Sequence, residues 1–356
     1  MTQETTIIGL MSGTSLDGLD MACVRFWRES ERYFYETIAT HCVPYSPEWQ
    51  HKLRQLEHAS ALEYAHAHVA LGAYFGQHAH AFIQQNNLNA QYIASHGHTI
   101  FHQPYSGITT QIGSLPHLAA ACKLPTIGDF RSLDVALGGQ GAPLVPVGDQ
   151  LLFHEYETCI NIGGIANLSY SHKNEQIAYD ICPANMLINY LCQKLSLDFD
   201  ENGAIAANGT PNLELLHKLD MWHYYQKSPP KSLGKEQIFE EIVPILRQTN
   251  DTIPNQIATV TLHIAQKISQ EINKIQPKTV LITGGGALNT HLMRLIKSQS
   301  HTAVSAASTE LINFKEAIIF AFLGYLRILN QPNCLKSVTG ASHNNCGGAI
   351  YLAHTP

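Results

Sequence analysis

Apolar runs alternate with short polar turns at the start of the chain, and this pattern predicts three antiparallel strands. Residues 5–8 are β-branched, residues 9–20 carry glycine, hydroxyl and acidic side chains, and residues 21–27 are again mostly apolar. A charged turn at residues 28–32 leads into a third run, residues 33–43. Sequential strands joined by tight turns are typical of a β-meander.

A later stretch repeats this organisation. Residues 157–161, 165–170 and 176–180 form strand-like runs, separated by a Gly-Gly turn and then by a polar turn. Apolar residues recur at helical spacing over residues 47–86 and 255–275. Strands that alternate with helices, with one unit duplicated, predict an α/β fold of two similar domains.

Two glycines lie within the first helical stretch. Gly72 and Gly76 predict a bent helix, or two helices, over residues 47–86. Near the other end of the chain, a buried strand at residues 279–282 is followed by glycines and then by a helix from residue 289. The chain thus returns to a strand–turn–helix arrangement after its second meander.

Length and composition exclude several classes of protein. The 356 residues favour two domains, and the apolar fraction of 45% suffices for large cores. The net charge of −6 comes with no basic patch for nucleic acid and no cationic amphipathic helix for a membrane surface. The start of the chain lacks the features of a signal peptide, and the apolar stretch 318–329 is too short to span a bilayer. A cytoplasmic protein with neither nucleic-acid nor membrane partners is therefore expected.

The cysteines and histidines do not indicate a structural metal site. The eight cysteines include no C-x-x-C pair, and most lie in apolar runs, where reduced, buried thiols are expected. The twenty histidines cluster in places, but without acidic or thiol partners at ligand spacing.

The turn at residues 9–20 contains the chemistry of a phosphate site. Gly13 and Gly18 allow a close backbone approach or a positive φ, and the threonine and serine between them supply hydroxyl groups. Asp17 and Asp20 could hold a hydrated cation. An ordinary hairpin turn favours the same residue types, so the turn alone leaves both interpretations open.

Three further segments combine polar side chains with strand ends or glycine. Residues 95–104 contain three histidines after a strand and are either a candidate ligand loop or a solvated turn with packed histidines. Residues 128–143 hold Arg131 between acidic residues, followed by glycines. They form either a functional loop at a domain junction, in which Arg131 faces an anionic or sugar ligand, or a linker with a surface ion pair. Residues 283–287 bring glycine backbone towards a nucleotide, although they match neither the dinucleotide-binding nor the P-loop motif.

Asp180 ends the third strand of the second meander, just before a helix. A carboxylate at a strand end points into the crevice outside the sheet, where it could act as a general base. The alternative is a helix N-cap, a position that aspartate fills well.

The glycine turns resemble those of the superfamily that unites sugar kinases, heat-shock chaperones and actin. In that superfamily two hairpins hold phosphates and a late glycine turn contacts adenosine. The motifs resemble the anhydro-N-acetylmuramic acid kinase family more closely, in the family's order and over nearly the whole chain. They are residues 11–18 (MSGTSLDG), 95–99 (SHGHT), 129–131 (DFR), 138–143 (GGQGAP), 161–167 (NIGGIAN), 231–236 (KSLGKE), 284–287 (GGGA) and 316–317 (EA).

The resemblance implies a two-lobed, actin-like ATPase fold with duplicated ribonuclease H-like domains and a central cleft. Residues 1–126 with about 338–356 would form one lobe and residues 127–337 the other, with the active site in the cleft between them. Family members are homodimeric, cytoplasmic enzymes of cell-wall peptidoglycan recycling that use ATP and Mg²⁺. They hydrolyse the 1,6-anhydro ring of anhydro-N-acetylmuramic acid and phosphorylate O6, which gives N-acetylmuramic acid 6-phosphate. Another sugar kinase or phosphatase of the superfamily, or a non-catalytic nucleotide-binding homologue, remains the alternative.

The resemblance also implies roles for individual residues. Asp180 would be the general base, and Arg131 would orient the sugar and the reacting groups. His96, Gly97 and Glu316 would bind the sugar, and Asp17 would hold Mg²⁺ directly or through water. The expected ATP contacts are Ser12, Gly13, Thr14, Ser15, Leu16, Asp17, Gly18, Gly163, Gly164, Asn167, Gly284, Gly285, Gly286 and Ala287.

Two segments depart from the family's pattern. Family members commonly carry DTGPGN at the catalytic strand end, whereas residues 180–185 read DICPAN. Ile181, Cys182 and Ala184 therefore remove a hydroxyl and two glycines, and the Cβ atoms of Cys182 and Ala184 restrict the backbone there. His98 stands where glutamine is usual. Because the aspartate, the proline and the asparagine are retained, activity is expected to be retained as well.

Overall fold

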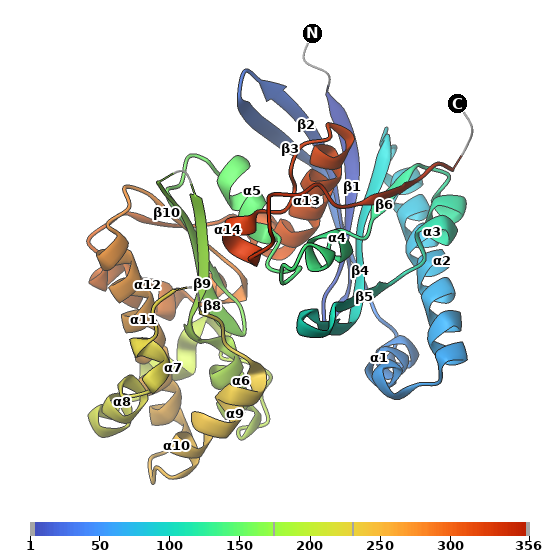
Figure 1. Cartoon of the computed structure of the whole chain (residues 1–356). Coiled ribbons are helices and arrows are strands. Elements are labelled where there is room, and N and C mark those ends of the chain that lie inside the picture. The colour runs from blue at the N-terminus through green and yellow to red at the C-terminus, as the bar shows by residue number, and fades with distance from the viewer. Residues whose placement is uncertain (1–3, 174, 230, 354–356) are drawn as a thin grey trace. The chain divides into compact units, whose positions relative to one another are not determined.

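The computed structural model describes residues 4–173, 175–229 and 231–353, and the chain divides into two units (Figure 1). Unit 1 comprises Met1–Leu152 and Phe314–Pro356, and unit 2 comprises Phe153–Asn313. The ends of the expected first lobe, at residues 1–3 and 354–356, lie outside the described residues. The boundaries between the units therefore lie at 152/153 and 313/314, and not at the expected 126/127 and 337/338. Residues 126–128 pair with the first sheet, and the helix that contains Ala317 packs against the same sheet, so both segments belong to unit 1.

A mixed sheet forms the centre of unit 1. Within the described residues it has seven strands, in the order β12-β6-β4-β1-β2-β3, with β5 paired to β4. The first three strands are antiparallel, which confirms the opening meander, whereas β4 runs parallel to both β1 and β6. The strands are β1 (Thr5–Ser12), β2 (Gly18–Glu29), β3 (Arg32–Pro44), β4 (Tyr92–Gln103), β5 (Ile108–Ile112), β6 (Thr126–Gly128) and β12 (Ala349–Tyr351).

Helices α2 and α3 pack against one face of this sheet and α13 against the other (Figure 1). Gly9 of β1 permits the close approach of α13, because a Cβ there would overlap the carbonyl oxygen of Ala317. The helices of this part of the chain are α1 (Pro47–Gln55), η1 (Leu56–His58), α2 (Ala61–Asn86), η2 (Pro104–Ser106), α3 (Leu115–Cys122), α4 (Ser132–Ala136), α5 (Val145–Leu151), α13 (Thr309–Ile328) and α14 (Lys336–Thr339).

Residues 47–86 form separate helices, but the break lies away from the two glycines. Ser60 caps α2 through a reciprocal pair of hydrogen bonds with Glu63, so α2 begins afresh after η1. Gly72 and Gly76 lie inside α2, where a Cβ on either residue would overlap the main chain of α3 or of Ser114 before it. These glycines therefore permit close helix packing and do not interrupt the helix.

Unit 2 repeats the strand order of unit 1. Its sheet has the order β11-β10-β7-β8-β9, in which β7, β8 and β9 form an antiparallel meander and β10 is parallel to β7 and β11. Both sheets place the first strand of their meander beside a parallel strand from later in the chain. This repetition confirms the predicted α/β fold class with two duplicated domains. The strands are β7 (Thr158–Ile162), β8 (Ile165–His172), β9 (Glu175–Pro183), β10 (Val280–Thr283) and β11 (Val304–Ala306).

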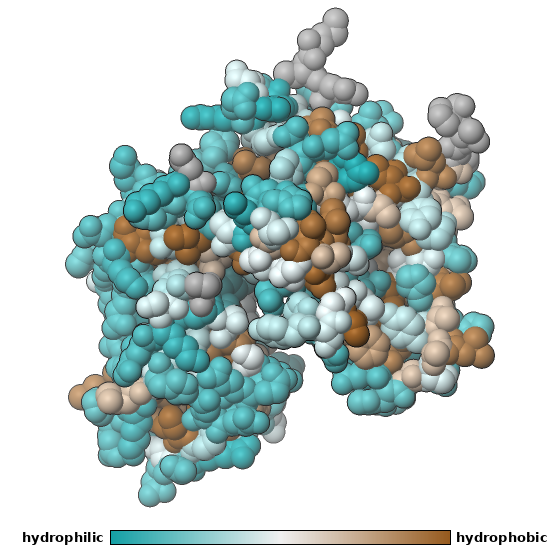
Figure 2. All heavy atoms as spheres, viewed as in Figure 1, coloured by the Kyte–Doolittle hydropathy of each residue, from teal (hydrophilic) through white to brown (hydrophobic). Residues whose placement is uncertain are grey.

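The core of unit 2 forms where α11 packs against the sheet. Buried Ile257, Ile264 and Ile268 of α11 pack in one cluster with residues of β7 and β8. Hydrophilic side chains predominate over α8, α9 and α10 on the face shown in Figure 2, with separate apolar spots between them. The helices are α6 (Asn185–Gln193), η3 (Glu201–Gly203), α7 (Ala204–Asn208), α8 (Leu213–Asp220), η4 (His223–Gln226), α9 (Lys235–Glu241), α10 (Val243–Arg247), α11 (Ile253–Ile275), η5 (Gly285–Leu288) and α12 (Thr290–Gln299). Across the described part of both units, no helix combines the length and apolar character needed to cross a membrane.

Candidate active site

The turn between β1 and β2 presents small polar residues to solvent. The Leu16 N–H donates to the Gly13 carbonyl oxygen at 3.2 Å, and the Leu16 side chain is buried in the core. Thr14, Ser15 and Asp17 are exposed around it. A Cβ on Gly13 would meet only the Ser15 hydroxyl, at 3.5 Å, so packing within the unit does not require glycine at this position. The open space allows a ligand to approach the backbone N–H groups of the turn.

The residues at the two ends of this turn have structural partners. The buried Ser12 hydroxyl forms hydrogen bonds with the Tyr45 hydroxyl at 2.6 Å and with Nδ1 of His98 at 2.8 Å. Burial lowers the pKa of His98 to about 4, so its ring is neutral at neutral pH. A Cβ on Gly18 would overlap the Val43 carbonyl oxygen of β3. Of the expected ATP contacts, these two therefore also stabilise the hairpin itself.

The expected ligand loop at residues 95–104 is almost entirely strand. β4 continues to Gln103, and its residues from His98 onwards pair with β5. His96 and His98 are buried in the unit and do not face solvent. Gly97 adopts a φ of 76°, and a Cβ there would lie 2.7 Å from the Ile112 carbonyl oxygen. The loop prediction is therefore wrong, and His96 and Gly97 are placed by a strand with a local irregularity.

His96 supports the guanidinium of Arg131. Arg131 donates to Nε2 of His96 from Nε at 3.1 Å and from Nη2 at 3.0 Å, and from Nη1 to the Gly141 carbonyl oxygen at 2.6 Å. Because a guanidinium only donates, Nε2 of His96 is the acceptor, and the ring proton lies on Nδ1, which donates to the Gly97 carbonyl oxygen at 3.0 Å. Burial and the Arg131 charge lower the pKa of His96 to about 3. The imidazole is thus a neutral support and not an acid catalyst.

Glu316 on α13 lies within the electrostatic influence of Arg131. Glu316 is exposed at the surface of unit 1, yet the protein around it desolvates the carboxyl and raises its pKa. The charges of Arg131 and Lys315 oppose that rise. Burial lowers the pKa of Arg131, and Glu316 opposes this in turn. Lys315 itself is buried, with Nζ 2.8 Å from Oδ1 of Asp149. Unit 1 therefore brings together the predicted sugar contacts His96, Arg131 and Glu316.

Asp134 organises the segment that follows Arg131, and the sequence analysis missed it. Its carboxylate is fully buried; Oδ2 accepts from the Gly141 N–H at 2.8 Å, and Oδ1 accepts from three donors of the segment after α13. These donors are Cys334 Sγ at 3.0 Å, Thr339 Oγ1 at 2.9 Å and Asn345 Nδ2 at 2.8 Å. No local pattern indicated this role, because three of the four donors lie about two hundred residues away.

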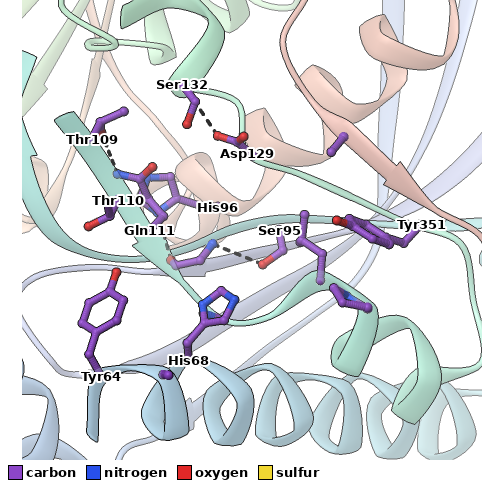
Figure 3. A pocket seen from close by; sticks show the side chains of 16 residues that line it. Tyr64, His68, Ser95, His96, Thr109, Thr110, Gln111, Asp129, Ser132 and Tyr351 are labelled. Atoms are coloured by element: carbon purple, nitrogen blue, oxygen red, sulfur yellow. Dashed lines mark hydrogen bonds between the residues drawn. The ribbon is translucent and has the colours of Figure 1, made fainter. Parts of the chain in front are cut away.

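A pocket of about 470 Å³ adjoins His96 and Gly97 within unit 1 (Figure 3). Tyr64 and His68 rise into it from α2, opposite Thr110 of β5. The Thr110 hydroxyl is buried and has no hydrogen-bond partner in the described part of the chain. Pockets of this size with a few convergent polar groups are typical small-molecule sites.

The turn between β7 and β8 of unit 2 has the same open character as the first hairpin turn. A Cβ on Gly163 would come no closer than 3.4 Å to Asn161, and one on Gly164 no closer than 3.5 Å to Met186. Their carbonyl oxygens accept from the first N–H groups of α6, at 3.1 Å for the Asn185 N–H. Both glycine turns therefore leave space that the fold itself does not need.

The glycines after β10 serve two purposes. Gly284 has a φ of 80°, and a Cβ there or on Gly286 would clash with residues 161–162 of β7. Gly285 is the open position, because a Cβ there would come no closer than 3.8 Å to its nearest neighbour beyond the adjoining residues, Asn185 Nδ2. Ala287 is buried in the core of the unit. Among the expected adenosine contacts, Gly285 is therefore the residue that packing leaves free.

Asp180 lies beside a β-bulge. Asn167 pairs with Asp180, whereas the adjoining Ala166 pairs with Cys182, so Ile181 is the extra residue. A bulge redirects neighbouring side chains and is common beside active sites. β9 continues to Pro183 and Ala184 occupies the N-cap position of α6, so the N-cap alternative for Asp180 is wrong.

Three hydrogen bonds fix Asp180 in unit 2. Its N–H donates to the Lys231 carbonyl oxygen at 3.2 Å, and its own carbonyl oxygen accepts from the Tyr224 hydroxyl at 2.6 Å. Oδ2 accepts from the Leu233 N–H at 2.8 Å, whereas Oδ1 receives no hydrogen bond from the described residues. Burial raises the pKa of the carboxyl, and the Leu233 N–H partly opposes this. A partly buried carboxylate with one unbonded oxygen suits proton abstraction.

Polar side chains form a row across the second sheet. Thr283, Asn161, Asn167 and Asp180 pair in register from β10 through β7 and β8 to β9. Asn161 has no role predicted from the sequence, although its cross-strand pairing places it on the same face as its partner Asn167. The row lies at the carboxyl ends of β7 and β10, where ligands bind in α/β sheets.

The acidic residues fit magnesium that arrives with a nucleotide. Within the described residues, no group of three or more histidine, cysteine, aspartate or glutamate side chains is arranged to hold a metal. Asp17 offers a single exposed carboxylate in the first glycine turn. Magnesium commonly binds through one or two carboxylates together with substrate phosphates and water, which matches this donor set.

The chain is similar to known proteins over almost its full length. The family described as anhydro-N-acetylmuramic acid kinase matches residues 5–353. A protein of that name from Microcystis aeruginosa is 36% identical, over 97% of this chain and 99% of its own length. One from Vibrio vulnificus is 33% identical over 99% of both chains. Among solved structures, component A of (R)-2-hydroxyglutaryl-CoA dehydratase from Acidaminococcus fermentans aligns with a TM-score of 0.43 at 12% identity, over 89% of this chain and 96% of its own.

Proposed function

The chain belongs to the anhydro-N-acetylmuramic acid kinase family, and we propose that it phosphorylates 1,6-anhydro-N-acetylmuramic acid with ATP while opening the anhydro ring with water. The product is N-acetylmuramic acid 6-phosphate, and the reaction serves peptidoglycan recycling. The family match over residues 5–353 carries this proposal. As a kinase of this family, the protein takes ATP and a sugar as small-molecule substrates.

Asp180 is the proposed general base. The water oxygen bonds to C1 of the sugar as the C1–O6 bond breaks, and Oδ1 of Asp180 accepts the proton that the water loses. O6 then takes the γ-phosphoryl group, and ADP leaves. The absence of a hydrogen bond to Oδ1 from the described residues, together with the raised pKa of the carboxyl, supports this role.

Unit 1 supplies the proposed sugar contacts. Arg131 uses three of its five N–H groups within the unit, and the other two have no partner among the described residues. These N–H groups are suited to a sugar oxygen or carboxylate, and Glu316 provides an acceptor for sugar hydroxyls. His96 and Gly97 border the pocket of Figure 3, which we propose receives part of the sugar.

The glycine turns are the proposed ATP site. Residues 12–18 and the residues Gly163, Gly164 and Asn167 would contact phosphates, and residues 284–287 would contact adenosine. The open space at Gly13, Gly163 and Gly285 supports backbone contacts with the nucleotide. Magnesium supplies charge neutralisation at the phosphates when it is bound, and Asp17 would hold it directly or through water.

The family also suggests an assembly and a location. We propose a cytoplasmic homodimer that binds neither nucleic acid nor membranes. The net charge of −6 supports the absence of a nucleic-acid partner, since phosphate backbones require basic surfaces. Size-exclusion chromatography with light scattering tests the dimer.

Product analysis in heavy-oxygen water tests the activity. The protein is incubated with ATP, Mg²⁺ and the anhydro-sugar in H₂¹⁸O, and the products are resolved by mass spectrometry. We expect a 6-phosphate sugar with ¹⁸O at C1 and none in the phosphoryl group. ATP binding without this product would refute the activity, and label in free phosphate would indicate ATP hydrolysis instead.

Asp180→Asn tests the general base. Turnover should fall at least about a hundredfold, since a positioned base contributes 10²–10⁴-fold. ATP binding should persist, measured by calorimetry. Asp198→Asn is the matched control in unit 2, because Asp198 is exposed. Unchanged turnover in Asp180→Asn would eliminate this residue as the base.

A further inference from the structure

In unit 2, Asp180 contacts Tyr224, Lys231 and Leu233, and these four residues are called the Asp180 ring below. The Tyr224 hydroxyl reaches the Asp180 carbonyl oxygen, and the Lys231 carbonyl oxygen accepts the Asp180 N–H. Two residues further on, the Leu233 N–H reaches the Asp180 carboxylate. The ring closes because Nζ of Lys231 lies 4.7 Å above the centroid of the Tyr224 ring.

The position of Asp180 in the sheet explains why it needs these partners. Among the described residues, β9 is the edge strand of its sheet, and no further strand pairs with its outer side. The bulge at Ile181 also interrupts the regular pairing with β8. Tyr224, Lys231 and Leu233 therefore take the place of a neighbouring strand at this one residue. The direction of the carboxylate depends on where that segment lies.

Aromatic rings hold Lys231. No carboxylate of the described residues lies within ion-pairing distance of Nζ, which is 4.7 Å from the Tyr224 ring centroid and 5.7 Å from that of Tyr179. A partly desolvated ammonium is attracted to the face of an aromatic ring. Tyr224 is fully buried, so its ring provides a fixed support for the Lys231 side chain.

We propose that Tyr224 and Lys231 are positioning residues for the general base. Together they hold the Leu233 N–H against Oδ2 of Asp180, which leaves Oδ1 free to accept a proton from the attacking water. This inference rests on the proposed role of Asp180. Neither positioning residue touches the reacting atoms.

The surroundings of Asp180 define the expected pH dependence. Besides Tyr224 and Lys231 themselves, the titratable groups of unit 2 that act on this ring include Tyr170, Tyr179, Cys182, Tyr225, Lys267, Glu271 and Lys274. Burial raises the pKa of Asp180, and the Leu233 N–H is the contact that lowers it. A weaker bond from Leu233 therefore raises the pKa of the base further, so activity requires a higher pH.

Two variants test the proposal, each with a matched control. Tyr224→Phe removes the hydroxyl but keeps the ring, and Lys231→Met removes the charge but keeps an unbranched side chain. Tyr225→Phe removes a neighbouring buried hydroxyl that has no hydrogen-bond partner among the described residues. Lys227→Met removes an exposed ammonium 5.8 Å from the same Tyr224 ring.

For both test variants, kcat should fall roughly tenfold while KM for ATP and for the sugar stays within about twofold, since only the geometry of the base changes. The acid limb of kcat/KM should move up by about one pH unit. The controls should match the unaltered protein. A test variant with an unchanged acid limb, or equal losses in tests and controls, would overturn the positioning role. An active Asp180→Asn would instead refute the base itself, independently of this ring.

Discussion

Replacement of Asp134 by asparagine should destabilise unit 1, because the carboxylate accepts four hydrogen bonds in a fully buried position. An amide has only one acceptor oxygen. In its better orientation the amide oxygen keeps the three donors at Oδ1, and the NH₂ group faces the buried Gly141 N–H. That N–H then lacks a partner, which costs about 1–3 kcal/mol, and the three remaining bonds lose their charge assistance.

The expected loss of unfolding free energy is about 3 kcal/mol, which corresponds to a fall in Tm of about 6–12 °C for a unit of this size. Differential scanning calorimetry measures it. Asp129→Asn is the matched control, because Asp129 is exposed and its φ of 62° suits asparagine, so Tm should hardly change.

The same substitution has a functional consequence. The Gly141 carbonyl oxygen accepts from Nη1 of Arg131, so a displaced Gly141 loosens the guanidinium. We expect KM for the sugar to rise more than KM for ATP. If Asp134→Asn unfolds within about 2 °C of the unaltered protein, the reasoning that four buried donors need a carboxylate is refuted.

Three further predictions concern unit 1. In the folded protein the pKa of His98 is lowered to about 4, whereas in the unfolded chain His98 takes up a proton below about pH 6.5. The free energy of unfolding should therefore fall from pH 7 to pH 5. His98→Gln should recover on the order of 2 kcal/mol of that loss, measured by unfolding experiments at each pH. Gly9→Ala should lower the free energy of unfolding by at least about 3 kcal/mol, because the added Cβ overlaps the Ala317 carbonyl oxygen. Gly13→Ala should leave Tm unchanged but weaken ATP binding, measured by calorimetry, at least about tenfold. Equal Tm values for both variants would contradict the packing argument. Asp17→Asn should raise the Mg²⁺ concentration for half-maximal turnover roughly tenfold at unchanged Tm, and an unchanged magnesium dependence would remove Asp17 from the metal site.

Local pattern was a sound guide wherever a segment's own residues decide its structure. The two meanders, the helix at residues 253–275 and the strand before Gly284 follow from apolar periodicity and turn residues, and the structure contains all of them. Patterns failed where a distant segment supplies the partner. Residues 95–104 read as a polar loop, yet β5 and the core bury their histidines and extend the strand.

The candidate site divides in the same way. The glycine turns and Asp180 could be singled out from the sequence, because short motifs of small and acidic residues have a local chemical meaning. Tyr224 lies in no such motif, and Leu233, although it lies in the 231–236 motif, had no role assigned to it, since both contact Asp180 across more than forty residues of chain. Asp134 was likewise indistinguishable from a surface acid until its four donors were in place.

The sequence by itself determined most of the strands and the long helices, the duplication and the family, because these depend on local periodicity and on motifs read in order. Tertiary structure alone decided which glycines serve packing and which remain open, which histidines are neutral, and which oxygen of Asp180 stays unbonded. Those properties are set by desolvation and by hydrogen bonds between segments that are distant in the chain. They exist only once the two sheets have assembled.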